Sequence, residues 1–116
     1  MIISFVSTKG GQGKSTLSLC LSYSKTFSKS YDSIGLVEMD VQGTLRSWYV
    51  YRSEKEEIKD DKVSFTQLIE KDSEKIKTVL KDTINRNKMV VLDVAGERLG
   101  KKYTQLAMRL SDVVII

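Results

Sequence analysis

The chain has 116 residues, of which 41% are hydrophobic and 29% are charged, and its formal net charge is +4. This size and composition predict one small domain with a single core, and no apolar run approaches the length of a membrane span. With no histidine and one cysteine, Cys20, the chain excludes histidine-based triads, the commonest zinc sites and an internal disulfide.

Strand-like and helix-like patterns alternate in the first half of the chain. We expect a first strand over residues 1–7. Apolar residues near helical spacing from Leu17 to Phe27 predict a first helix, with Cys20 on its apolar side as a buried, inert thiol. Residues 34–39 predict a second strand, and Leu45, Trp48 and Tyr49 predict a short helix after it.

The same alternation continues in the second half. After a charged stretch over residues 53–62, we expect a short strand at 63–65 and an amphipathic helix around 76–84. A buried strand follows at 89–92, then a helix around 103–110 and a strand at 113–116. This order predicts an α/β fold, in which crossover helices cover both faces of a mostly parallel sheet.

A glycine-rich segment lies between the first strand and the first helix. It reads Lys9-Gly10-Gly11-Gln12-Gly13-Lys14-Ser15-Thr16. Glycines let the backbone come close to a ligand, so that N–H groups at a helix N-terminus can point at phosphate oxygens. The Lys14 side chain would reach the β and γ phosphates, and the Ser15 hydroxyl would ligate Mg²⁺. Residues 10–16 therefore form a predicted nucleotide-binding loop.

Two acidic residues follow apolar strands, Asp40 and Asp93. The carboxyl ends of parallel strands face one crevice, so we expect both residues near the phosphate-binding loop. Asp93 would hold Mg²⁺, and the N–H of Gly96 could approach the γ-phosphate. Asp40 would position the attacking water or, alternatively, cap the helix that carries Trp48. Glu38 could contribute to the outer shell of the metal.

The loop spelling K-G-G-x-G-K-[ST] departs from the strict Walker A pattern because Thr8 replaces the first glycine. It resembles the deviant Walker A loop of the ParA/MinD P-loop ATPases, and the chain is most similar to small plasmid-partition proteins. The family segment D-x-D-P-Q-G is matched at Asp40, Gln42 and Gly43, with Trp48 downstream, whereas Glu38 and Val41 differ. A third segment, Asp93-Val94-Ala95-Gly96, fits together with Ser111 to Ile116.

This resemblance implies a Mg-dependent ATPase that forms a homodimer around ATP and acts in plasmid or chromosome partition. Lys9 would cross to the partner's phosphates, so Lys9, Lys14 and Asp40 are the implied catalytic residues. Similar proteins bind DNA non-specifically in the ATP state and respond to a centromere-binding protein. We expect a cytoplasmic protein with no membrane segment, and association with the nucleoid stays open.

The resemblance also implies that residues 1–116 are a single domain, the N-terminal part of a longer family domain. The family continues beyond the strand matched by residues 113–116, so we expect a truncated chain or one that completes its sheet by association. Two other functions stay open. One is a nucleotide-gated interaction module with little catalysis, and the other is a MinD-like membrane-associated regulator.

Overall fold

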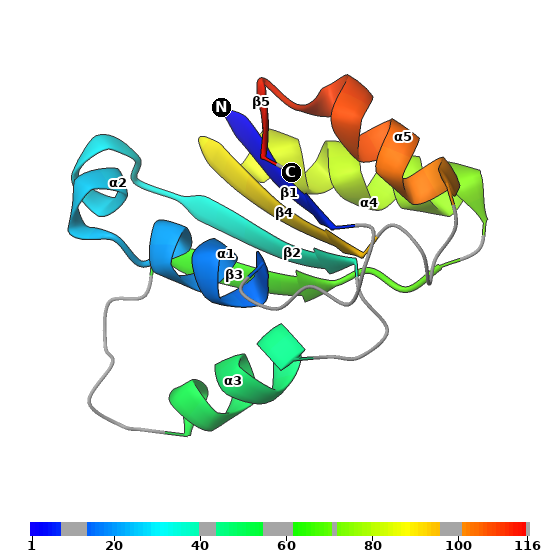
Figure 1. Ribbon diagram of the computed structural model, residues 1–116. Helices are drawn as coiled ribbons and strands as arrows, with labels where there is room; N and C mark the ends of the chain where they lie inside the picture. The colour runs from blue at the N-terminus through cyan, green and yellow to red at the C-terminus, as the bar shows by residue number, and fades with distance from the viewer. Residues whose placement is uncertain (8–13, 40–43, 55–61, 71, 96–100, 116) are drawn as a thin grey trace.

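One sheet organises the computed structural model, which describes residues 1–7, 14–39, 44–54, 62–70, 72–95 and 101–115 (Figure 1). The sheet has five strands in the order β3-β2-β4-β1-β5, and every neighbouring pair is parallel. The strands are β1 (Ile2–Ser7), β2 (Ile34–Met39), β3 (Val63–Gln67), β4 (Met89–Ala95) and β5 (Val113–Ile115). This confirms the α/β fold and the parallel sheet predicted from the sequence.

Helices connect the parallel strands, as such crossovers require. They are α1 (Lys14–Ser22), α2 (Lys25–Ser30), α3 (Thr44–Ser53), α4 (Ser73–Arg86) and α5 (Lys101–Leu110). Figure 1 shows α1 and α3 on one side of the sheet and α4 and α5 on the other. Among the described residues, no helix is both long enough and apolar enough to cross a membrane.

Each face of the sheet has its own core. Side chains of α4 and α5 pack on one face, where Ile76, Leu80 and Ala107 are buried among alternate residues of β1, β2 and β4. The opposite face packs against α1 and α3, with Leu45 buried and Leu19 and Leu21 partly buried. Strands β2 and β4 supply side chains to both faces, which accounts for their continuous apolar sequence.

The first helical region differs from the sequence prediction. The expected single helix is two helices, α1 and α2, with a break at residues 23–24. Cys20 is exposed rather than buried, so that prediction is wrong. The buried face of α1 consists of Lys14, Ser18 and Ser22, one turn apart, which turns Cys20 toward solvent. Small serines on this face leave room for the helix to lie against the sheet.

The other elements fall close to their predicted positions, and β3, α4, β4 and α5 have longer bounds than predicted. Helix α4 begins earlier than expected because Asp72 caps it, accepting a hydrogen bond from Glu74 N at 2.9 Å. Strand β3 extends to Gln67, two residues beyond the predicted end. Strand β5 lies at the edge of the sheet, with Val113 and Ile115 at 42% and 40% exposure. Residues 55–61 of the charged stretch and Ile116 lie outside the described residues.

Candidate functional site

A buried carboxylate on the central strand is the centre of the candidate site. Asp93 lies near the carboxyl end of β4, in register with Phe5 of β1 and Glu38 of β2, and its side chain is fully buried. A buried carboxylate is costly to charge unless donors or cations surround it. The neighbours of Asp93 supply both.

Lys14 is the cation beside Asp93. It is the first residue of α1, and its ammonium donates a hydrogen bond to Asp93 Oδ1 as part of an ion pair. The two side chains are 6% and 0% exposed, so this pair is almost entirely removed from water. The ammonium of Lys14, the predicted phosphate-binding group, therefore contacts the carboxylate of Asp93, the predicted metal ligand.

Ser15 contacts the other oxygen of the Asp93 carboxylate. Its hydroxyl donates to Asp93 Oδ2 over 3.0 Å. Thr16, the next residue of the predicted loop, is exposed on α1. Two consecutive residues at the start of α1 thus converge on Asp93, as the crossing of a strand end and a helix N-terminus predicts.

Glu38 is a second buried acid at the site. Its side chain is fully buried, with Oε2 accepting from Leu45 N at 2.7 Å and Oε1 accepting from Gln67 Nε2 at 3.2 Å. Burial raises the pKa of the Glu38 carboxyl above its usual value of 4.5, and the charge of Asp93 raises it further. The hydrogen bonds from Leu45 and Gln67 lower the pKa in opposition.

These contacts fit the donor set of a magnesium-nucleotide site. Mg²⁺ in phosphoryl-transfer sites is held by one or two protein oxygens, with phosphate and water completing its shell. The Ser15 hydroxyl and the Asp93 carboxylate are two such oxygens on one small region. Within the described residues, acidic, histidine and cysteine side chains form no group of three or more that could hold a metal ion by themselves.

Several predicted site residues lie outside the described residues. They are Lys9, Gly10, Gly11, Gln12, Gly13, Asp40 and Gly96. Their roles in the nucleotide site stay predictions, as do the roles assigned to Lys14, Ser15, Thr16 and Asp93. What the structure adds is that Lys14, Ser15 and Asp93 are in direct contact.

Sequence reasoning missed Gln67. It predicted β3 only as far as residue 65, so Gln67 was not placed beside the carboxyl end of β2. The register of the two parallel strands pairs Glu38 with Gln67. A buried glutamate within an apolar strand must find donors, and that requirement was the available signal.

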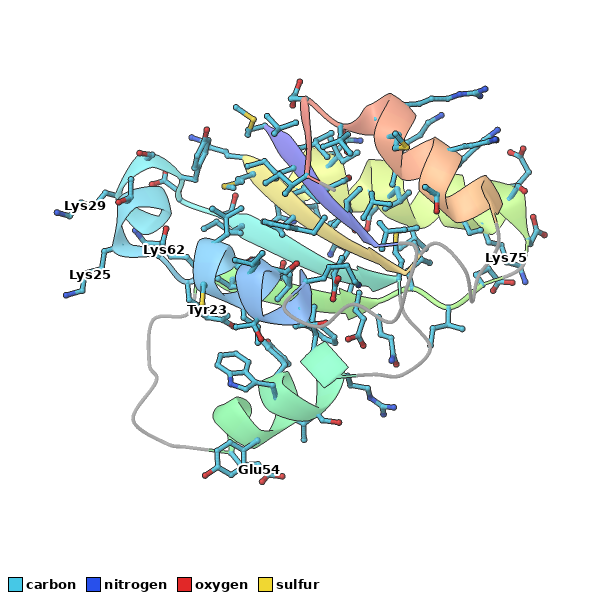
Figure 2. The ribbon with its side chains drawn as sticks, viewed as in Figure 1. Tyr23, Lys25, Lys29, Glu54, Lys62 and Lys75 are labelled. Carbon is cyan, nitrogen blue, oxygen red and sulfur yellow. The ribbon has the colours of Figure 1, made fainter. Side chains whose placement is uncertain are left out.

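Part of the basic excess lies away from this site. Figure 2 shows Lys25 and Lys29 projecting from α2, at the opposite end of the sheet from the carboxyl edge. Lys62 is exposed there as well, and its carbonyl accepts from Ile34 N at the start of β2. The net charge of the chain is therefore not explained by the nucleotide site alone.

Comparison with known families places this geometry in context. The family described as the CobQ/CobB/MinD/ParA nucleotide binding domain matches residues 3–114, which is nearly the whole chain. The matched range includes β1 from its second residue, the predicted phosphate-binding loop and the Asp93 region. No curated protein sequence matches the chain.

Proposed function

Because this chain belongs to the CobQ/CobB/MinD/ParA nucleotide-binding family, we propose that it binds and hydrolyses Mg-ATP. The observation that carries the proposal is the convergence of Lys14 and Ser15 on the buried carboxylate of Asp93. Phosphoryl transfer requires a group that binds phosphate, a divalent cation and a fixed carboxylate that holds the cation. The side chains of Lys14, Ser15 and Asp93 are groups of the kinds that bind phosphate and the cation.

Each residue has a distinct proposed role. Lys14 clamps the β and γ phosphates, and Ser15 and Asp93 hold the metal, which neutralises charge on the phosphates when bound. Asp40 positions the attacking water, and the N–H groups of residues 10–16 and Gly96 orient the nucleotide. The contact between Lys14 and Asp93 supports this assignment, because it places the proposed phosphate-binding ammonium beside the proposed metal carboxylate.

Substitution of Lys14 tests the proposal. We expect Lys14→Ala to abolish binding of Mg-ATP, measured by isothermal titration calorimetry, and phosphate release, measured by a coupled assay. Lys88→Ala is a matched control, because this exposed lysine interacts with Asp32 at the opposite edge of the sheet. Normal turnover in Lys14→Ala would contradict the proposed function.

We further propose that ATP drives homodimer formation, with Lys9 of each chain contacting the nucleotide of its partner. Light scattering with Mg-ADP and with a non-hydrolysable Mg-ATP analogue tests this step. Dimer formation only with the analogue, lost in Lys9→Ala, is the expected result. A mass that does not respond to nucleotide would refute the dimer. Residues 1–116 are proposed to act in it as one domain.

The biological role that we propose is DNA segregation, in plasmid or chromosome partition, in the cytoplasm or on the nucleoid. It rests on the family and on the resemblance of the loop to partition ATPases. Non-specific DNA and a centromere-binding protein are the proposed partners. Stimulation of ATP hydrolysis by double-stranded DNA of arbitrary sequence would support this role. A rate of hydrolysis in the presence of DNA that does not change with salt concentration would count against it.

An interaction module with little catalysis is the second candidate, and the surface of α3 favours it. Trp48, Val50 and Tyr51 are 37%, 46% and 61% exposed on this helix, which follows residues 40–43 directly. Exposed apolar groups gathered on one helix are typical of interaction surfaces. Asp40→Ala separates the candidates. Retained binding with lost turnover supports the ATPase, whereas a wild type that binds without turnover supports the module.

A further inference from the structure

Glu38 connects three elements of the fold. It stands on β2, its carboxylate accepts from Leu45 N in the first turn of α3, and it also accepts from Gln67 at the end of β3. The Arg46 N–H donates to the same carboxylate. The Glu38 carbonyl accepts from Leu68 N at 2.8 Å, which adds a main-chain link to the segment after β3. A single residue thus ties the start of α3 to the middle of the sheet.

The connection brackets a functional segment in sequence. Residues 40–43, with the proposed water-positioning Asp40, join Glu38 and Met39 of β2 to Thr44 and Leu45 of α3. Glu38 and Leu45 are seven residues apart, and a hydrogen bond across them fixes the separation of the two anchor points. Both anchors are fully buried, so neither can shift without disturbing the core.

We propose that Glu38 is a positioning residue that holds the start of α3 against β2 and β3, and thereby fixes Met39 and Thr44, the two described residues between which the sequence places Asp40. This inference rests on the proposed ATPase function and extends it to a residue outside the proposed phosphate-binding and metal-binding set of Lys14, Ser15 and Asp93. A second consequence is that a hydrogen bond connects α3, which carries exposed aromatic side chains, to β2, the strand beside Asp93.

The length of the side chain is the critical property. An aspartate at position 38 would withdraw the carboxylate by about 1.5 Å, the length of one carbon–carbon bond. The bonds of 2.7 Å and 3.2 Å could then not both persist with the strand in place. Glutamine has the same reach, since its oxygen can accept from Leu45 N while its amide donates to the Gln67 side-chain oxygen. Comparison of the two variants therefore separates reach from charge.

Trp48 gives a readout that is independent of catalysis. It is the single tryptophan of the chain and lies on α3, where its ring meets that of Tyr23 with centroids 5.3 Å apart. A displacement of α3 would change this contact. Tryptophan emission and its quenching by acrylamide therefore report the position of α3 in the intact chain.

The experiment compares Glu38→Asp, Glu38→Gln and Ile34→Val, three changes on β2. Ile34 is buried at the opposite end of this strand, so Ile34→Val controls for destabilisation without touching the connection. In Glu38→Asp we expect kcat for ATP to fall about tenfold or more, since misplacement of about 1 Å can cost a factor of 100, with KM changed less than about threefold. Quenching of Trp48 should increase. Ile34→Val should keep kcat and quenching near wild type, and Glu38→Gln should keep quenching near wild type.

Unchanged kcat and quenching in Glu38→Asp would overturn the inference, and so would equal increases in quenching in Glu38→Gln and Glu38→Asp. A parallel loss of kcat and of affinity for a non-hydrolysable Mg-ATP analogue would also refute it, because that result describes general damage. A wild type without turnover refutes the ATPase, whereas Trp48 quenching still decides whether Glu38 holds α3. Should Glu38→Asp fail to fold, Gln67→Ala removes one bond of the connection and must then reproduce the increase in quenching.

Discussion

The ion pair between Lys14 and Asp93 makes a measurable prediction about the nucleotide-free protein. Its side chains are 6% and 0% exposed, so it belongs with buried pairs rather than with surface pairs worth about 0–1 kcal/mol. Removal of one partner from a buried pair costs about 3–5 kcal/mol, because the other charge is left without compensation. In Lys14→Met the remaining charge is Asp93, whose register neighbour is the acidic Glu38. We therefore expect Lys14→Met to lower the free energy of unfolding by about 3 kcal/mol or more.

A double-mutant cycle isolates the pair from other effects. Lys14→Met, Asp93→Leu and the double variant are unfolded with urea in buffer free of nucleotide and Mg²⁺, followed by circular dichroism. The double variant leaves no buried charge from this pair. Its loss of unfolding free energy should therefore be about 2 kcal/mol smaller than the sum of the losses in the two single variants. The exposed pair of Lys77 and Glu74 provides the matched control, with an expected coupling of a few tenths of a kcal/mol. Additivity within about 0.5 kcal/mol at Lys14 and Asp93 would refute this reasoning.

Three further predictions concern stability. Because the pKa of Glu38 is raised in the folded protein, the carboxyl favours folding below its usual value of 4.5, and this contribution is lost as the pH rises through the raised pKa. Glu38→Gln should therefore gain stability relative to wild type as the pH rises from 4.5 to 8 in urea titrations, and a gain that shrinks with pH would contradict this. Gly35→Ala places a Cβ at 2.9 Å from Asn87 Nδ2 and 3.0 Å from Thr83 Cγ2, and should cost about 1–3 kcal/mol, measured by urea unfolding. Asp72→Ala removes the cap of α4 and should cost about 1 kcal/mol in the same assay, whereas an unchanged midpoint would show that the cap is dispensable.

The sequence was sufficient for the sheet and for the meeting of Lys14 and Ser15 with Asp93. Short apolar runs such as 89–92 are typical of buried strands, and parallel strands bring their carboxyl ends to one edge. An acid after such a run was therefore expected beside the loop that follows β1. The structure confirms this proximity through the contacts of Asp93.

The sequence was insufficient where tertiary contacts decide the outcome. Cys20 and Leu17 were placed on the buried face of the first helix from apolar spacing, yet Leu17 is 54% exposed and Cys20 is exposed. The requirement that Lys14 meet Asp93 fixes the rotation of α1, and burial of Ser18 and Ser22 follows one and two turns later. A polar contact at the first residue thus overrides the apolar pattern. The bonding of Glu38 to Leu45 and Gln67 depends on strand register, which the sequence alone did not supply.

The charges at the site explain why nucleotide and metal should bind together under the proposed function. Lys14 compensates Asp93 in the structure, with Glu38 buried beside them. When Lys14 turns to a phosphate, Asp93 loses the Lys14 cation while it remains in register with Glu38, and the charge of Asp93 opposes the ionisation of Glu38. A divalent cation held by Ser15 and Asp93 would remove that penalty. Phosphate binding by Lys14 and cation binding by Asp93 therefore support each other, since each relieves the cost that the other creates.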